Sequence, residues 1–299
     1  MKNPLMKILV TGKNGQVGYE LARCLAPLGE VLATDRQQLD MSRPETLRAF
    51  LELHKPDVIV NAAAYTAVDK AEEEEVLATA VNGHSVGELA EWARQSKALL
   101  VHYSTDYVFD GKNSEPYLES HATKPINAYG RSKLVGEVAL AEIDPHYLCL
   151  RTSWVYATRG QSFFLTMLRL AKEREELGIV GDQFGVPNFA PSLADATAKL
   201  VGLAQDRIKE GRCKSGIYHL SGQGSCSWFE FAEQIFALAR PTTKLALERA
   251  KAISTEQYPT PAERPKYSVL SNLALQEDWG LQLPTWQAML GEAIKTLQS

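Results

Sequence analysis

Two residues that can transfer protons between oxygen atoms, Tyr129 and Lys133, stand four positions apart. A free tyrosine has a pKa of about 10, and a nearby lysine ammonium favours the phenolate and lowers that pKa. The spacing puts both side chains on one face of a helix. Thr105 precedes them in a polar run that also contains Asp106, and its hydroxyl can bind a substrate carbonyl. The set predicts reduction of a ketone, with Tyr129 as proton donor, Lys133 as its partner and as a nicotinamide-ribose ligand, and Thr105 polarising the carbonyl.

A tyrosine and a lysine at this spacing are a weak signal alone, but a glycine-rich loop near the start of the chain strengthens it. Gly12, Gly15 and Gly18 follow the apolar run 8–10 and open the helical pattern 16–28. In that context the loop predicts close approach of a dinucleotide pyrophosphate, which the helix N-terminus would bind. The three-residue spacing of the glycines is typical of short-chain dehydrogenases and their extended, sugar-nucleotide-using members.

The residues after the second predicted strand, 30–34, affect the choice of cofactor. Asp35 can accept hydrogen bonds from the adenosine ribose, which favours NADH. Arg36 can bind the 2′-phosphate of NADPH instead, or lie on the surface as an ordinary arginine. The prediction is therefore NADPH or NADH. Asp40 and Met41 are predicted to border the adenine.

Strand and helix patterns alternate through the first half of the chain. The predicted strands are 8–10, 30–34, 58–60, 98–101 and 146–150, and the predicted helices are 16–28, 44–54, 73–96 and 128–142. The second half is less regular, with helices 163–175, 193–209, 228–239 and 285–297 and strands 179–181 and 216–220. This order predicts an α/β fold with a Rossmann-type doubly wound parallel sheet. We expect an NAD(P)-binding domain over 1–155, joined by a returning segment near 190–225, and a smaller C-terminal α/β substrate domain over 156–299.

The composition excludes several classes of protein. The net charge of −4 argues against a nucleic-acid partner. The four cysteines are scattered and the six histidines show no ligand spacing, so no metal is predicted. No apolar stretch approaches the length of a membrane span, and the N-terminus does not resemble a signal segment. These features predict a cytoplasmic enzyme with no membrane partner.

Five stretches closely resemble the dTDP-4-dehydrorhamnose reductase family, a branch of the extended short-chain dehydrogenases/reductases. They are 61–72 (NAAAYTAVDKAE), 101–109 (VHYSTDYVF), 151–156 (RTSWVY), 182–187 (DQFGVP) and 259–265 (PTPAERP). The resemblance covers nearly the whole chain. It implies reduction of dTDP-4-dehydro-L-rhamnose to dTDP-L-rhamnose, a precursor of cell-surface polysaccharides, with hydride from NADPH or NADH. The implied partner is the nucleotide sugar, bound by a monomer or homodimer.

The resemblance also implies roles for single residues. Positions that match cofactor contacts are Gly15, Gln16, Val17, Asp35, Asp40, Met41, Ala64, Tyr65, Thr66 and Tyr103. Asp106 and Trp154 match substrate contacts, although Trp154 could instead be a core residue. From its chemistry and its proline-rich loop, Arg264 is predicted to bind the diphosphate, with a surface salt bridge as the alternative.

The chain departs from the family pattern at two positions. Pro191 stands where some members have a glutamate of a magnesium-mediated dimer interface, which argues against such a dimer here. Asn188 replaces a frequent threonine and is expected to reshape the nucleotide end of the pocket. Two alternative functions remain: reduction of another nucleotide-linked 4-ketosugar, and a non-catalytic regulatory subunit of the same fold.

Overall fold

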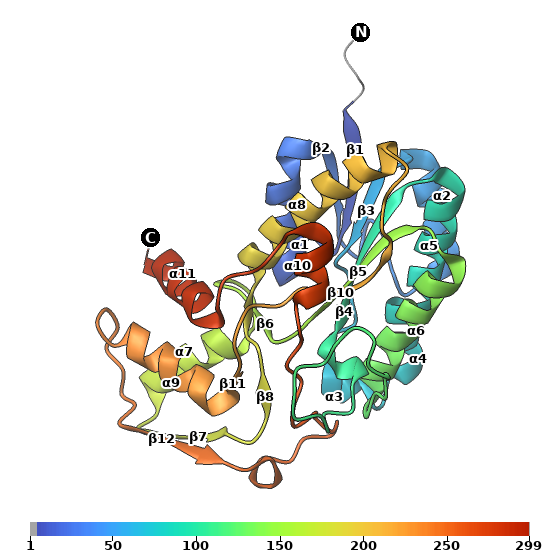
Figure 1. Ribbon diagram of the computed structural model, residues 1–299. Coiled ribbons are helices and arrows are strands. Elements are labelled where there is room, and N and C mark those ends of the chain that lie inside the picture. Colours follow the sequence, from blue (N-terminus) through green and yellow to red (C-terminus); the bar gives the residue numbers. More distant parts are fainter. Residues whose placement is uncertain (1–4, 299) are drawn as a thin grey trace.

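The computed structural model describes residues 5–298, so the predicted domain limits at residues 1 and 299 lie outside the described residues. The centre of the molecule is a six-stranded parallel sheet in the order β10-β5-β4-β3-β1-β2 (Figure 1). Its strands are β1 (Met6–Thr11), β2 (Gly29–Thr34), β3 (Val58–Asn61), β4 (Leu99–Thr105), β5 (His146–Thr152) and β10 (Gly216–His219). The α/β class and the doubly wound sheet are confirmed.

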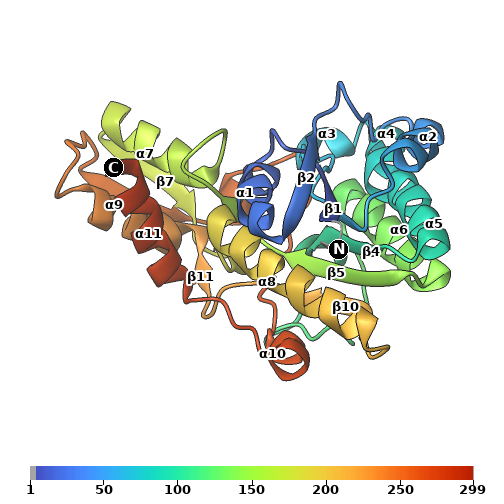
Figure 2. The same cartoon turned by 90° about the horizontal axis from the view of Figure 1, so that it is seen from above.

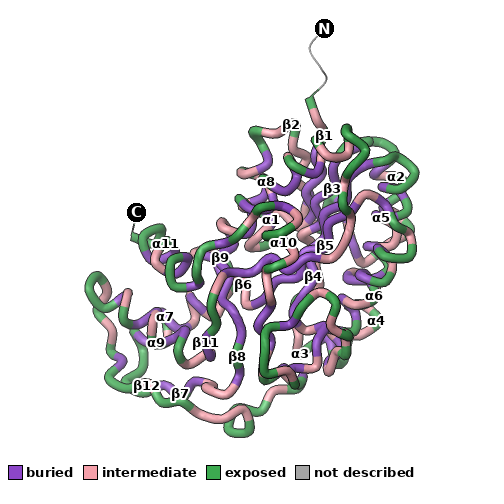
Figure 3. The backbone as a smooth tube through the Cα atoms, viewed as in Figure 1, coloured by how far each residue is buried: buried purple, intermediate pink, exposed green. Residues whose placement is uncertain are grey.

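Helices cover both faces of this sheet, as Figure 2 shows from above. One face carries α1 (Gln16–Leu25) and α8 (Ala190–Lys209), which pack against each other. The other carries α2 (Pro44–His54), α5 (Ser85–Ser96) and α6 (Ala128–Ile143). Strand residues on both faces are buried, because apolar helix stripes pack on each side (Figure 3). The chain reverses its winding direction between β1 and β3, and such a switch point forms a crevice at the carboxyl ends of the strands.

One predicted helix, 73–96, is interrupted. Short helices α3 (Val68–Ala71) and α4 (Glu75–Thr79) are followed by a π-helical turn, Ala80–His84, before α5 begins. Such a turn widens the helix by one residue and reorients the side chains next to it. The polar Asn82 inside this turn is fully buried, so tertiary hydrogen bonds compensate for the irregular backbone.

The second half of the chain forms a smaller layer beside the carboxyl ends of the sheet (Figure 1). Its helices are α7 (Phe163–Glu173), α9 (Trp228–Ala239) and α11 (Trp286–Gln298), whereas α10 (Leu273–Trp279) packs on the edge strand β10. Its strand pairs are β6 (Val155–Tyr156) with β9 (Asn188–Phe189), β7 (Glu176–Val180) with β12 (Arg249–Ile253), and β8 (Phe184–Gly185) with β11 (Cys226–Ser227). The chain returns from this layer to the sheet, where α8 packs on α1 and β10 forms an edge strand, and then leaves the sheet again for α9. The exact domain limits stay a prediction.

Candidate active site

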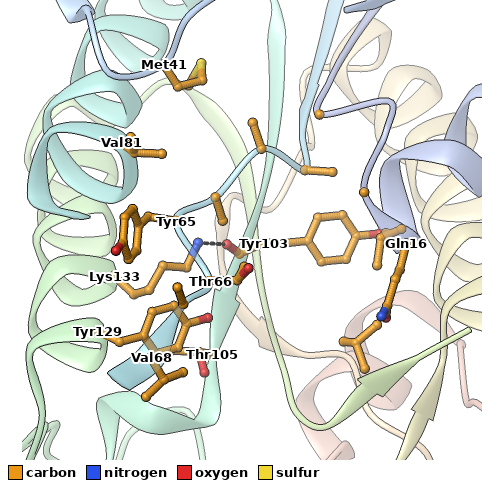
Figure 4. A pocket seen from close by; sticks show the side chains of 18 of the residues that line it. Gln16, Met41, Tyr65, Thr66, Val68, Val81, Tyr103, Thr105, Tyr129 and Lys133 are labelled. Carbon is orange, nitrogen blue, oxygen red and sulfur yellow. Dashed lines mark hydrogen bonds between the residues drawn. The ribbon is translucent and has the colours of Figure 1, made fainter. Parts of the chain in front are cut away.

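A cavity of about 1050 Å³ follows the carboxyl ends of β1, β3 and β4 and extends to the second half of the chain. The predicted residues that line it are Gly12, Gly15, Gln16, Val17, Asp35, Arg36, Asp40, Met41, Ala64, Tyr65, Thr66, Tyr103, Thr105, Asp106, Tyr129, Lys133 and Trp154. Gly18 and Arg264 are not among the lining residues. Residues from distant parts of the sequence thus meet in one space. Gln16, which follows the glycine loop, and Tyr129 lie on different walls of it (Figure 4).

The glycine loop has the backbone that a bound pyrophosphate requires. Gly12 has a φ of 72°, and a Cβ there would lie 2.8 Å from the backbone of Ala63 on the neighbouring strand end. A Cβ at Gly18 would lie 2.1 Å from the carbonyl oxygen of Gly12, so this glycine allows close packing without lining the cavity. Gly15 caps α1 without any side-chain hydrogen bond, so no side chain occupies the first N–H groups of the helix. These groups fit a diphosphate.

The adenosine end of the cavity contains two positive and two negative side chains. Asp35 Oδ2 lies 3.1 Å from Lys13 Nζ, and this hydrogen-bonded lysine lowers the pKa of Asp35. Arg36 is 75% exposed in its side chain and lies 3.4 Å from Asp40. The local charge is balanced, and both the NADH-type carboxylate and the NADPH-type guanidinium line the cavity.

The start of α6 is fixed by capping groups that the sequence reading missed. The Asn127 side chain accepts a hydrogen bond of 2.8 Å from Gly130 N, and it donates one of 2.8 Å to the carbonyl of Glu263. Glu72 Oε1 accepts another of 2.8 Å from Ala128 N. The two caps satisfy free N–H groups of the first turn, where Tyr129 stands. Asn127 could have been found from the sequence, because an asparagine preceding a helical pattern is a common N-cap.

Tyr129, Lys133 and Thr105 lie together, as Figure 4 shows. Thr105 closes β4, and its hydroxyl lies close enough to the Tyr129 phenol to lower the pKa of that tyrosine. Lys133 is buried, and its Nζ donates a hydrogen bond of 2.5 Å to the backbone carbonyl of Tyr103. The three side chains therefore line one wall of the cavity, with the ammonium deeper than the phenol.

The pKa values differ from the simple sequence expectation. Burial raises the pKa of Tyr129 to about 12, and the neighbouring Thr105 hydroxyl opposes this only in part. Lys133 does not contribute, because its ammonium bonds to Tyr103 instead of the phenol. Burial also lowers the pKa of Lys133 to about 8, against the charge of Glu137. In this structure Tyr129 therefore keeps its proton at neutral pH, as a proton donor must.

Asp106 is a buried carboxyl group beside Thr105. Its Oδ1 accepts a hydrogen bond of 3.0 Å from the Thr105 hydroxyl. Its Oδ2 is buried without a hydrogen-bond partner among residues 5–298. Burial raises the pKa of Asp106 to about 7. A buried polar atom without a partner is costly, so this oxygen fits a ligand hydroxyl that enters the cavity.

Asn82, which the sequence analysis did not single out, holds the loop that follows β3. Its side chain accepts a hydrogen bond of 2.9 Å from Tyr65 N and donates one of 3.0 Å to Tyr65 O. It also donates a hydrogen bond of 2.9 Å to Ser132 Oγ, which connects this loop to α6. The available signal was an asparagine at helical spacing from the apolar Val86, Leu89 and Ala93 in the predicted helix.

The second half of the chain contributes an aromatic wall. Trp154 has a φ of 44°, unusual for a bulky residue, and stacks on Trp228 with 3.5 Å between ring centroids and 9° between ring planes. Asn188 is buried and donates a hydrogen bond of 2.8 Å to the carbonyl of Ser153, so it orders the turn before Trp154. Both indoles line the cavity. Trp228 was missed, because a tryptophan that starts a helical pattern gives no separate signal.

Arg264 forms the alternative contact that the sequence left open. Its two terminal nitrogens bind both carboxylate oxygens of Asp69, at 2.8 and 2.9 Å, and the pKa of Asp69 is lowered by this pair. The planar fork of Arg264 is thus engaged by a carboxylate. Its contact with a diphosphate stays a prediction, which requires exchange of Asp69 for the ligand.

Residues 5–298 contain neither a candidate metal site nor a candidate membrane-spanning helix. No group of three or more metal-ligating side chains comes together. No helix has the length and apolar character needed to cross a membrane.

The comparisons with known proteins agree over the full chain. The family model described as "RmlD substrate binding domain" matches residues 6–299. A dTDP-4-dehydrorhamnose reductase of Burkholderia thailandensis is 52% identical, covering 98% of this chain and 100% of the relative. The Escherichia coli K12 protein of the same name is 46% identical, with 97% and 99% covered.

Solved structures show the same likeness. A dTDP-4-dehydrorhamnose reductase of Clostridium acetobutylicum has a TM-score of 0.88 at 39% identity, covering 98% of this chain and 100% of the other. One from Bacillus anthracis, in complex with NADP, has a TM-score of 0.89 at 36% identity, covering 98% and 99%.

Proposed function

The chain belongs to the dTDP-4-dehydrorhamnose reductase family, and on this premise we propose that Tyr129 is its proton donor, with Lys133 and Thr105 as its partners. The protein is an NAD(P)H-dependent oxidoreductase that reduces dTDP-4-dehydro-L-rhamnose to dTDP-L-rhamnose. Bound NAD(P)H supplies the hydride to the carbonyl carbon. The residues of this chain must orient the ketone, hold the cofactor and deliver one proton to the oxygen.

The observation that carries the proposal is that Tyr129 and Thr105 lie side by side on the wall of the cavity (Figure 4). Thr105 can donate a hydrogen bond to the substrate carbonyl and so favour negative charge on its oxygen. Tyr129 holds its proton at neutral pH because burial raises its pKa to about 12. The oxygen of a reduced ketone is an alkoxide, a stronger base than a phenolate, so proton transfer from Tyr129 to it is favourable.

Lys133 supports this step as a buried ammonium. Its hydrogen bond to the Tyr103 carbonyl keeps it on the floor of the cavity. From there we propose that it donates to the nicotinamide ribose hydroxyls and places positive charge near the developing phenolate. Its pKa of about 8 leaves it mostly protonated at neutral pH. We therefore expect turnover to decline above about pH 8.

The proposed substrate contacts lie beside Thr105 and on the wall formed by the second half of the chain. Asp106 Oδ2 is placed to accept a hydrogen bond from a sugar hydroxyl, and the stacked Trp154 and Trp228 offer an apolar wall to a deoxysugar. Arg264 is proposed for the diphosphate. One chain contains all these groups, which supports a monomer or a homodimer as the working form in the cytoplasm.

The test is replacement of Tyr129 by phenylalanine. Loss of general acid catalysis typically costs 10²–10⁴-fold in rate, so we expect Tyr129→Phe to lower kcat by at least ~100-fold. Dissociation constants for NADPH and NADH should change little, because the hydroxyl is the only group lost. Tyr258→Phe is the matched control, since Tyr258 is 61% exposed and does not line the cavity. A Tyr129→Phe enzyme with a kcat near the wild-type value excludes this tyrosine as proton donor.

A second assay examines the substrate. Oxidation of NADPH is followed with dTDP-4-dehydro-L-rhamnose and with other nucleotide-linked 4-ketosugars at equal concentrations. We expect the highest kcat/KM with the dTDP-rhamnose precursor. A higher value with another ketosugar would assign the pocket to that substrate.

A further inference from the structure

A buried carboxylate lies two helical turns below the predicted proton donor. Tyr129, Lys133 and Glu137 stand at positions i, i+4 and i+8 of α6, on one face of the helix. The side chains of Glu137 and Arg151 are each only 2% exposed. Arg151 donates two hydrogen bonds to Glu137, Nε to Oε1 at 2.8 Å and a terminal nitrogen to Oε2 at 2.6 Å. This two-pronged geometry fixes the orientation of both groups.

The same carboxylate binds a second strand. Ser104 Oγ donates a hydrogen bond of 2.5 Å to Glu137 Oε1. Ser104 on β4 and Arg151 on β5 are direct register partners, as are Thr105 and Thr152 one position later. Glu137 therefore joins α6 to two neighbouring strands one residue below the level of Thr105.

Each element joined by Glu137 carries a different part of the proposed site. Helix α6 carries Tyr129 and Lys133, and β4 ends with Thr105. Strand β5 leads through Thr152 into the turn of Trp154. The distances between Tyr129, Thr105 and Trp154 thus depend on the three hydrogen bonds that the Glu137 carboxylate accepts. Reaction rates are sensitive to displacements of about 1 Å between such groups.

Further contacts hold Arg151 from its other side. Its guanidinium lies over the ring of Phe109, 5.0 Å from the ring centroid. Its remaining terminal nitrogen is 3.5 Å from His219 Nε2. Burial and the positive charge of Arg151 lower the pKa of His219 to about 3, so this histidine is neutral. Glu137 is accordingly the carboxylate that neutralises Arg151.

We propose that Glu137 is a positioning residue of the reductase: its carboxylate sets the spacing of Tyr129 and Lys133 from Thr105 and Trp154. The inference rests on the proposed function of those four residues. Stability alone does not explain the pair, because a buried ion pair can often be replaced by apolar residues without loss of stability. Removal of one partner is different, since it leaves an uncompensated charge in the interior.

A comparison of a variant that lacks only Glu137 with one that lacks both Glu137 and Arg151 therefore distinguishes an effect on kcat from an effect on stability. The purified enzyme is assayed with NADPH and dTDP-4-dehydro-L-rhamnose as Glu137→Gln, as the double variant Glu137→Met with Arg151→Met, and as Ser104→Ala. We expect Glu137→Gln to lower both kcat and Tm. The double variant should regain most of the Tm, yet its kcat should stay about 10–100-fold low while both KM values change less than about threefold. Glu142→Gln, an exposed glutamate on the same helix, is the control and should match the wild type.

The outcome that overturns the proposal is a double variant with restored Tm and wild-type kcat, because Glu137 would then serve stability alone. Should the double variant not fold, Ser104→Ala decides, since it removes one hydrogen bond and no charge. We expect a severalfold lower kcat at unchanged Tm for Ser104→Ala, and a wild-type kcat contradicts positioning. These results are independent of the Tyr129→Phe assay, which alone tests the proton donor.

Discussion

At the scale of single residues, the site holds ionisable groups away from their ordinary pKa values, and Asp106 is the clearest case. Burial raises its pKa to about 7, and one of its oxygens lacks a partner among the described residues. The folded protein therefore prefers the protonated carboxyl, whereas the unfolded chain ionises with a pKa of about 3.9. A group that serves ligand binding in this way lowers the stability of the free enzyme at neutral pH.

This gives a prediction for stability against pH. Because the folded-state pKa exceeds the unfolded value, wild-type stability falls as pH rises from about 4 to about 7 and then levels. Asp106→Asn cannot ionise, so its Tm relative to wild type should increase by roughly 5 °C between pH 5 and pH 8. Differential scanning fluorimetry of both proteins without ligands, from pH 5 to pH 8, measures this difference in Tm.

The control for that series is Asp110→Asn. The pKa of Asp110 is lowered by hydrogen bonds from Lys112 and Tyr117, although partial burial opposes this. Its titration therefore ends below pH 5, and the Tm difference of Asp110→Asn should be flat between pH 5 and pH 8. A flat profile for Asp106→Asn as well would contradict the ionisation of Asp106 in that interval.

A second prediction at this scale concerns cofactor choice. Arg36 lines the cavity and is exposed enough to reach a 2′-phosphate, and a charge-assisted hydrogen bond contributes about 1.5–3 kcal/mol. We expect Arg36→Ala to raise the KM for NADPH by roughly 10-fold and to leave the KM for NADH nearly unchanged. Arg43→Ala, at an exposed arginine outside the cavity, is the control. Equal increases with both cofactors would show that Arg36 does not discriminate between them.

At the scale of elements, the sequence predicted the regular parts well because apolar periodicity determines them. Helix 44–54 and helix 228–239 have the predicted limits, and the glycine loop lies between a strand and a helix as expected. The fourth strand was predicted to end at 101 but continues to Thr105. Its last residues are polar yet buried, because they face ligand space and hydrogen-bonding partners instead of an apolar layer. The departure from periodicity thus coincides with the candidate site.

The interrupted helix around Asn82 shows the second limit of the sequence reading. Periodicity over 73–96 suits a continuous helix, and nothing local requires the π turn at Ala80–His84. The turn is supported by a hydrogen bond that Asn82 accepts from Tyr65 N and one that it donates to Ser132 Oγ, both from residues distant in sequence. The same reason explains why Glu137 was not recognised: its partners Arg151 and Ser104 can be found only from tertiary structure.

A prediction at the element scale concerns how α6 is seated. A Cβ at Gly130 would lie 2.2 Å from the backbone oxygen of Tyr107, so Gly130→Ala must displace the first turn of α6, where Tyr129 stands. We expect a lower Tm and at least a ~10-fold lower kcat. Gly202→Ala in α8 is the control, because a Cβ there meets open space and alanine favours a helix by up to about 1 kcal/mol. A wild-type kcat for Gly130→Ala would mean that the helix tolerates this displacement.

At the scale of the whole molecule, the cavity is completed only where the two halves of the chain meet. The sheet half supplies the glycine loop and, on α6, the proposed proton donor Tyr129, and the second half supplies Trp228 at the start of α9. Residues 159–161 of the second half also contact the region of the glycine loop and α1. Gln16 Nε2 donates a hydrogen bond of 2.6 Å to Gln161 O, and the guanidinium of Arg159 lies over the ring of Tyr19. Ligands that bind here contact both halves.

Trp228 is the residue through which the second half is expected to affect binding of the sugar. Its indole stacks on Trp154 at the sugar end of the cavity and also packs on Phe163, with 4.5 Å between ring centroids. Stacked aromatic pairs contribute about 0.5–1.5 kcal/mol beyond buried area, so Trp228→Ala should raise the KM for the nucleotide sugar by roughly 3–10-fold.

The cofactor provides the internal reference for that variant. The glycine loop and Asp35 come from the sheet half of the chain, so we expect the KM for NADPH to stay within about twofold. Trp228→Phe should recover part of the sugar affinity by keeping a stacking ring. Phe184→Ala, at a 39% exposed aromatic residue of the second half that does not line the cavity, controls for loss of an aromatic side chain alone. Equal rises in both KM values would indicate that Trp228 supports the packing of the two halves and not the sugar in particular. A rise for the sugar alone would show that the second half contributes to substrate recognition, together with Thr105 and Asp106 of the first half.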